Sequence, residues 1–136
     1  IFCLPDINDT KYFEKMKHII RQNHIKEDFL FVNKKAELYP IIKKSHLFIR
    51  PTITDGDALS IRESIECDVP VISSDVVERP EGTILFKSRD FGDLFNKTNE
   101  VICNYNMHKE EIKNIEIKDN AVKIFEIYKE VIKKRI

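Results

Sequence analysis

The stretch FIRPTITDGDALSIRESIECDVPVISSD, residues 48–75, decides the fold. An apolar strand pattern at 47–49 leads into the acidic turn 50–57, which is followed by a helical pattern at 58–67 and a second apolar strand pattern at 70–73. Apolar strands without polar alternation are typical of parallel sheets, in which both faces of each strand are buried. The stretch therefore predicts one strand-helix-strand unit of a parallel α/β fold.

The same alternation of strand and helix extends over the whole chain. It predicts a Rossmann-like parallel sheet with helices on both faces. In this interpretation residues 1–105 form one partial Rossmann-like domain, 106–119 a linker or loop, and 120–136 a C-terminal amphipathic helix. The expected strands are 1–4, 29–32, 47–49, 70–73 and 83–86, and the expected helices are 10–24, 36–44, 58–67, 91–104 and 120–135.

Composition and charge exclude several classes of protein. The 136 residues are 42% hydrophobic and 34% charged, which suffices for a core of one-domain size. Lys and Arg total 23, and Asp and Glu also total 23, so no net charge attracts nucleic acid or an anionic membrane. Cys3, Cys67 and Cys103 lie far apart without a CxxC pair, which argues against structural zinc and favours a reducing, cytoplasmic compartment.

The ends and the apolar runs of the sequence add two further expectations. No apolar run approaches the about 20 residues of a membrane-spanning helix, and the N-terminus lacks the features of a signal peptide. The sequence begins at Ile1, directly inside an apolar segment. We therefore expect a fragment of a longer protein without a transmembrane segment.

The turn 50–57 is the richest candidate for a ligand site. Ligands of parallel sheets bind at the carboxyl ends of the strands, where this turn is expected to lie. Gly56 lets the backbone turn and a ligand approach, and the unpaired amides at the start of the following helix form an anion site. Asp55 would border the same site. Asp57 directly precedes the helix, so an N-cap is the alternative interpretation of that residue.

Glu63 is the second carboxylate of interest, because it lies in a helix whose other residues are mostly apolar or small and are expected to face the core. A partly buried carboxylate needs hydrogen-bond donors or a ligand, and the hydroxyls of a sugar or ribose would serve. The structural alternatives are an ion pair with Arg62 or a capping box with Ser60. The apolar or small residues around Glu63 are Leu59, Ile61, Ser64, Ile65 and Cys67.

The segment PTITDGDALSIRESIECDVPVISSD resembles the donor-site signature of retaining GT-B glycosyltransferases of the family 4 type, P-S-x-x-E-G-F-G-x-x-x-x-E-A-M-A-x-G-x-P-V-I-x-[ST]-D. The family's two acids, with seven residues between them, are kept as Asp55 and Glu63. Further likeness comes from IFCLPDIND, from DFLFVNKKAELYPIIKKSHLFIRPT and from VVERPEGTILFKSRDFGDL, whose RPEG is similar to that of polysaccharide-assembly members. The matching positions of the signature are Pro51, Gly56, Leu59, Glu63, Pro70, Val71, Ile72 and Asp75.

The resemblance implies the carboxyl half of a GT-B fold that lacks its first strand-helix unit, with a role for each site residue. Glu63 would hold the ribose hydroxyls of the donor, and Asp55 would lie at the donor sugar as the catalytic residue. Asn33 would contact the base, and Glu81, or the backbone of its turn, would contact the donor. Backbone amides for the diphosphate and sugar would come from Gly56, Asp57, Ala58 and Leu59, although the family has an aromatic residue and a second glycine where this chain has Asp57 and Ala58.

The implied reaction is transfer of a sugar from a nucleotide-diphosphate donor to an acceptor hydroxyl with retention, as a hexosyltransferase in polysaccharide or glycoconjugate synthesis. The resemblance implies neither cofactor nor metal, since helix-start amides and basic side chains stabilise the leaving diphosphate. The partners are the donor and an N-terminal acceptor domain that this sequence does not include, so the fragment alone is expected to be inactive. A cytoplasmic location follows, and peripheral contact with the inner face of the membrane stays open, as do the sugar, the nucleotide, the acceptor and the basic residues at the diphosphate.

Two interpretations without sugar transfer remain. A phospho-receiver domain shares the alternating order and a Lys after the last strand, here Lys87. A receiver, however, needs an acidic pair at its first strand, where only Asp6 is present, and a full helix where 74–82 is too short. The other alternative is a non-catalytic α/β interaction module.

Overall fold

The computed structural model of the chain describes residues 1–3, 9–32, 34–116 and 120–133. The chain divides into two compact units, Ile1–Leu38 and Tyr39–Ile136. This division falls inside the range 1–105 that was expected to be one domain. The expected division into domain, linker and terminal helix otherwise stays a prediction.

The first unit is a small parallel α/β element in which several aromatic rings pack against one another. Phe2 lies opposite Phe31 in the ladder of its two parallel strands. The Phe13 ring of the helix meets the Phe31 ring edge to face, with centroids 5.4 Å apart. Asp9 caps the helix by accepting a hydrogen bond from the Tyr12 amide. The elements are β1 (Phe2–Cys3), α1 (Thr10–Gln22), the 3-10 turn η1 (Lys26–Asp28) and β2 (Phe31–Val32).

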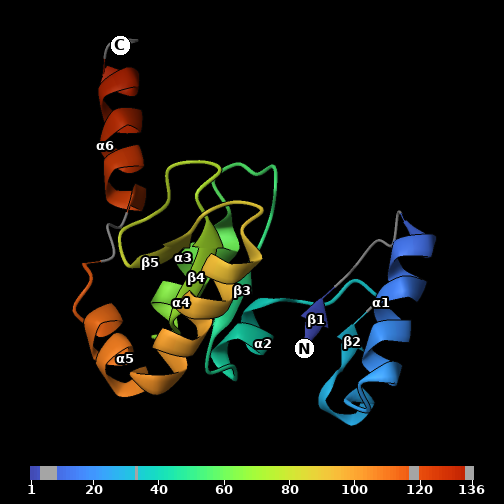
Figure 1. Ribbon diagram of the computed structural model, residues 1–136. Coiled ribbons are helices and arrows are strands. Elements are labelled where there is room, and N and C mark those ends of the chain that lie inside the picture. The colour runs from blue at the N-terminus through green and yellow to red at the C-terminus, as the bar shows by residue number, and fades with distance from the viewer. Residues whose placement is uncertain (4–8, 33, 117–119, 134–136) are drawn as a thin grey trace. The chain divides into compact units, whose positions relative to one another are not determined.

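The second unit is built on a parallel sheet of strand order β3-β4-β5, shown in Figure 1. The central strand β4 is buried along its whole length, which explains why its sequence has no polar alternation. The strands are β3 (Phe48–Arg50), β4 (Val71–Ser74) and β5 (Thr83–Phe86), and the helices are α2 (Tyr39–Lys43), α3 (Leu59–Glu66), α4 (Phe91–Cys103), α5 (Tyr105–Lys113) and α6 (Asn120–Lys133).

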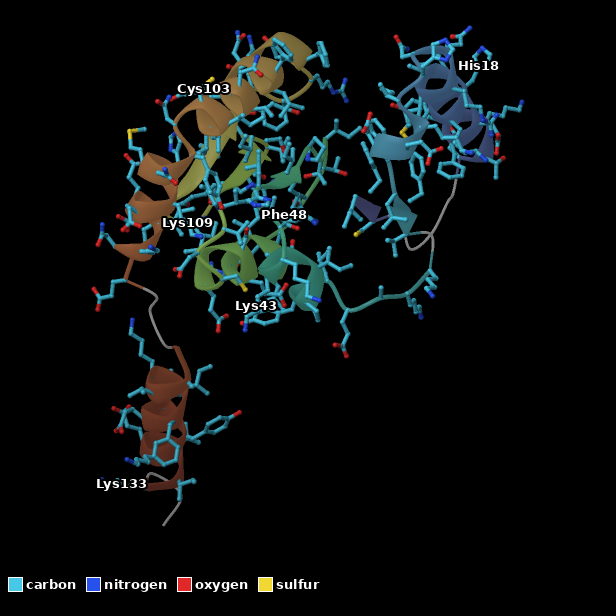
Figure 2. The ribbon with its side chains drawn as sticks, turned by 90° about the horizontal axis from the view of Figure 1, so that it is seen from below. His18, Lys43, Phe48, Cys103, Lys109 and Lys133 are labelled. Carbon is cyan, nitrogen blue, oxygen red and sulfur yellow. The ribbon has the colours of Figure 1, made fainter. Side chains whose placement is uncertain are left out.

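Successive residues of β4 point into two separate cores. Val71 packs in a cluster with Ile61 of α3 and Ile112 of α5, and Phe48 of β3 packs against this cluster. Figure 2 labels Phe48. Ile72, the next residue, packs against Val101 of α4. Helices therefore cover both faces of the sheet, which confirms the predicted α/β class with parallel strands.

The structure corrects one sequence-based expectation and confirms another. Residues 105–113, which were expected to be part of a linker or loop, form α5, because His108 and Ile112 lie one turn apart and are both buried. The connection between β4 and β5 contains no helix, as the short segment 74–82 predicted, so the helix that a receiver needs there is absent.

Candidate functional site

The turn between β3 and α3 is tied to the carboxyl end of β4 by hydrogen bonds. Ser73 and Ser74 are the last two residues of β4 and are fully buried. The Ser74 hydroxyl donates to the Thr52 carbonyl at 2.6 Å, and the Ser73 hydroxyl donates to the Arg50 carbonyl at 3.4 Å. These bonds hold the turn at the edge of the sheet where ligands of parallel α/β folds bind.

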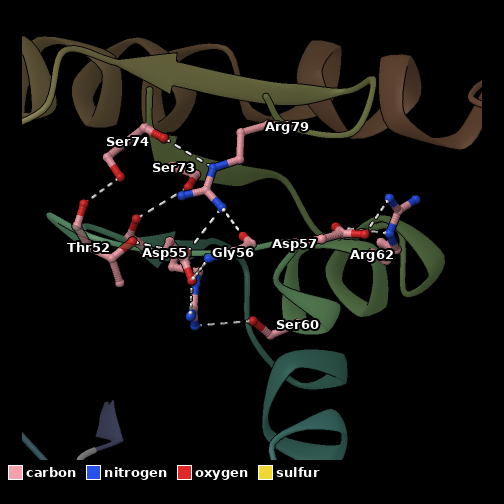
Figure 3. Close-up of polar contacts among 10 residues, drawn as sticks. Thr52, Asp55, Gly56, Asp57, Ser60, Arg62, Ser73, Ser74 and Arg79 are labelled. Carbon is pink, nitrogen blue, oxygen red and sulfur yellow. Dashed lines mark hydrogen bonds and ion pairs between the residues drawn. The ribbon is translucent and has the colours of Figure 1, made fainter. Parts of the chain in front are cut away.

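The Asp55 carboxylate lies at the centre of this turn, where Figure 3 shows its contacts. Arg50 binds it in a bidentate manner, with Nε at 2.6 Å and Nη2 at 2.9 Å. The Thr52 hydroxyl and the Gly56 amide each donate to it at 3.0 Å. Arg79 Nη1 completes the set at 3.1 Å, and the Asp55 side chain is only 9% exposed. The carboxylate thus points into the protein and not into solvent.

These contacts control the protonation of Asp55. The hydrogen bond from the Arg50 guanidinium is the largest cause that holds the pKa of the Asp55 carboxyl far below its usual range. Thr52 and Arg79 act in the same direction, whereas burial opposes them. The pKa of Arg50 is raised in turn by the same hydrogen bond. Asp55 is therefore ionised at neutral pH and is a poor proton acceptor.

Arg79 joins the end of β4 to the turn, although sequence analysis gave it no role. Its side chain is 1% exposed. Nε donates to the Ser74 carbonyl at 3.1 Å, and Nη1 donates to the Gly56 carbonyl at 3.2 Å. Nη2 is buried and has no hydrogen-bond partner among the residues that the structure describes. The RPEG motif marks this arginine, but its partners depend on the pairing of β3 with β4.

The start of α3 carries no side-chain cap. The N-cap residue is Ala58, which is extended and makes no capping hydrogen bond. The interpretation of Asp57 as the cap is wrong, because its carboxylate instead pairs with Arg62 at 3.0 Å on the surface. The amides at the start of this eight-residue helix therefore meet no side-chain acceptor, so they are suited to an anion.

Glu63 lies in the second turn of α3 and is partly buried. Within the described ranges its carboxylate has no hydrogen bond or ion pair. Both structural alternatives are wrong: Arg62 pairs with Asp57, and Ser60 lies within the helix with its hydroxyl 3.5 Å from Arg50 Nη1. The carboxylate is available for ligand hydroxyls.

The remaining predicted site residues differ in what the structure shows. Gly56 and Leu59 are exposed, and a Cβ added at Gly56 would meet no atom within 4 Å, so the space beside this residue is open. Glu81 is exposed in the turn before β5. Asn33 lies outside the described residues. The structure thus brings Asp55, Gly56 and the α3 start together and leaves the roles of these residues as predictions.

No group of three or more His, Cys, Asp or Glu side chains in the part of the chain that the structure describes is placed to hold a metal ion. No helix there is both long enough and apolar enough to cross a membrane.

Comparison with known proteins shows the fold. No protein-family model matches the chain, and no curated protein matches it either. The structure of Anabaena Alr3699/HepE in complex with UDP matches with a TM-score of 0.65 over 76% of this chain. The structure of the same protein with UDP and glucose matches with 0.70 over 83%. Sucrose-phosphate synthase from Thermosynechococcus elongatus matches with 0.68 over 98%.

The three matches are each 15% identical in sequence, so the likeness is one of fold. This chain spans 30% to 37% of the length of the matched chains. Its α/β structure corresponds to part of GT-B glycosyltransferase structures.

Proposed function

We propose that the chain is the nucleotide-sugar-binding half of a retaining glycosyltransferase. The observation that carries the proposal is the uncapped start of α3 at the carboxyl edge of a parallel sheet, together with Glu63 about one turn further along this helix, whose carboxylate has no partner among the described residues. An anion and a pair of hydroxyls, the two chemical features of a nucleotide diphosphate, suit these two groups. The fold likeness to a protein solved with UDP supports the same assignment.

The proposal gives each part of the site a binding role. The diphosphate lies at the backbone of Asp57, Ala58 and Leu59, where the open space beside Gly56 admits it, while the Gly56 amide keeps its hydrogen bond to Asp55. Glu63 accepts hydrogen bonds from the ribose hydroxyls. Asp57 adds little repulsion, because Arg62 neutralises it at 3.0 Å. Charge stabilisation of the leaving group comes from amides and arginines and needs no metal.

The remaining assignments extend the proposal beyond the described site. Asn33 contacts the base and Glu81 the donor. The acceptor hydroxyl is bound by a domain outside this sequence, the reaction belongs to polysaccharide or glycoconjugate synthesis, and this chain alone is inactive. Contact of Asp55 with the donor sugar stays a prediction, and the two arginines on its carboxylate argue against it.

Calorimetric titration of the chain with UDP and GDP tests the nucleotide role. Glu63→Ala is expected to lower the affinity for the nucleotide about tenfold, because a charge-assisted hydrogen bond to ribose is lost. The matched control is Glu66→Ala, which removes an exposed carboxylate from the same helix and should leave the affinity unchanged. Equal affinities of wild type and Glu63→Ala would contradict the role of Glu63. Absence of nucleotide binding, even in a longer protein that carries the missing first unit, would contradict the function.

A further inference from the structure

The charged groups beneath the Gly56 turn carry an inference about the proposed donor site. We propose that Asp55 is a positioning residue whose carboxylate holds Arg50 and Arg79 against the turn before α3, and that the excess positive charge of these three residues stabilises the donor diphosphate. The second half rests on the proposed function, and the first half does not. We call Arg50, Asp55 and Arg79 the buried triad, in which Asp55 and Arg79 are shielded from solvent and Arg50 keeps 30% of its side chain exposed.

The first step is that Asp55 has no capacity left for a sugar hydroxyl. An ionised carboxylate offers about four lone-pair sites. One Asp55 oxygen accepts from Arg50 Nη2 and the Gly56 amide, and the other accepts from Arg50 Nε and the Thr52 hydroxyl. The second oxygen also forms an ion pair with Arg79 Nη1. A donor sugar could be bound here only if a protein contact were given up.

The second step is that the buried triad fixes the shape of the turn. Arg50 ends β3, and Arg79 follows β4, so Asp55 links two neighbouring strands through its carboxylate. Arg79 also donates to the Gly56 carbonyl. With this carbonyl held toward Arg79 Nη1, the turn has a fixed orientation before α3 begins. Such preorganised amides bind an anion without a further ordering cost.

The third step is the charge. Two guanidinium groups face one carboxylate, so the buried triad carries one positive charge in excess, and arginine does not lose its proton in proteins. The Asp57–Arg62 pair beside it is neutral overall. Arg79 Nη2 also has donor capacity that no described residue uses. A diphosphate at the α3 start is the ligand whose charge this arrangement complements.

The triad is tested first without any ligand, by hydrogen exchange of the amides of residues 53–58. Asp55→Asn is expected to speed their exchange about tenfold, because the turn loses both ion pairs that order it. Asp57→Asn is the matched control, since it breaks an acid–arginine pair on the surface two positions away, and it should leave exchange unchanged. If Asp55→Asn does not fold, Thr52→Val removes one contact to the carboxylate and should produce a smaller increase. Unchanged exchange in the variants that fold would overturn the positioning role.

The charge is tested by comparing UDP with uridine. Arg79→Gln is expected to lower the affinity for UDP about tenfold and to leave the affinity for uridine unchanged, because the lost charge acts on the diphosphate alone. Lys113→Gln is the control and should change neither affinity, because it removes an exposed charge on α5 that pairs with Glu110. Asp55→Asn should also lower the affinity for UDP, because the two arginines lose the carboxylate that positions them. Unchanged UDP affinity in both Asp55→Asn and Arg79→Gln would overturn the inference. Failure of the wild-type chain to bind UDP would instead contradict the proposed function, and the positioning role of the triad would then be decided by the hydrogen-exchange result alone.

Discussion

At the scale of single residues, the two acids of the chain's signature have opposite environments. The Asp55 carboxylate is held by two arginines, a hydroxyl and an amide, whereas Glu63 has no hydrogen-bond or ion-pair partner in the described ranges. Acids that share a motif can therefore have different tasks. Asp55 contributes mainly to the structure of the turn, and Glu63 is free to bind a ligand.

The low pKa of Asp55 makes a prediction about stability and pH. Asp55→Asn should lower the free energy of unfolding by about 3 kcal/mol at pH 7, near the lower end for breaking a buried ion pair, because Arg50 is 30% exposed. Since the folded pKa lies below the unfolded value, the stabilisation is complete above the ordinary Asp pKa of about 3.9 and is lost as the pH falls toward the folded pKa. Urea unfolding of wild type and variant across this range measures the difference.

The comparison has a clear control and a clear contrary result. Asp57→Asn, at an exposed ion pair, should change stability little at any pH. A difference between wild type and Asp55→Asn that grows as the pH falls would show the wrong sign for a carboxyl with a lowered pKa.

A substitution at Gly56 should affect nucleotide binding but not the stability of the fold. Its φ is not positive, and an added Cβ would meet nothing within 4 Å, so Gly56→Ala should keep the stability within about 1 kcal/mol of wild type. The same methyl group would occupy the approach to the helix start and weaken nucleotide binding. Gly82→Ala is the contrasting variant and should lower the stability clearly, because Gly82 has φ 86° and an added Cβ would overlap the Ile115 side chain. Thermal unfolding and a UDP titration measure both effects, and unchanged UDP affinity in a stable Gly56→Ala would contradict the placement of the diphosphate.

At the scale of elements, the sequence predicted the strands and helices of the second unit well because their apolar residues follow regular spacing. Val71 and Ile72 are both buried on β4, as expected of a strand covered on two sides. The helix at 105–113 was missed because only His108 and Ile112 anchor it, and a histidine gives no apolar signal. The turn was recognised from Gly56 and its acids, but the role of Asp57 was not, because its pairing with Arg62 depends on where α3 begins.

The packing of α5 gives a prediction at this scale. Ile112 is 4% exposed and belongs to the same core cluster as Ile61 and Val71. Ile112→Ala should destabilise the chain by about 2–5 kcal/mol, since it leaves a cavity. Met107→Ala, at a position on the same helix that is 50% exposed, should cost far less. Equal and small losses in chemical denaturation would indicate that 105–113 behave as the linker first expected.

At the scale of the whole molecule, the sequence indicated the class of fold but not its division. The parallel ladders β1-β2 and β3-β4-β5 belong to separate compact units, a boundary that periodicity cannot show because both units use the same strand-helix pattern. The buried triad was also beyond the sequence, since Arg79 meets Asp55 only after β3 pairs with β4. The motif predicted the position of the turn.

The central claim is that the uncapped start of α3 binds the diphosphate of a nucleotide sugar. The most direct test is an amide NMR titration of the chain with UDP, which detects weak binding residue by residue. The account predicts that the largest shifts fall on the amides of Asp57, Ala58 and Leu59, and that uridine, which lacks the diphosphate, leaves these amides nearly unmoved. Saturating shifts elsewhere in the chain, with these three amides unmoved by UDP, would contradict it.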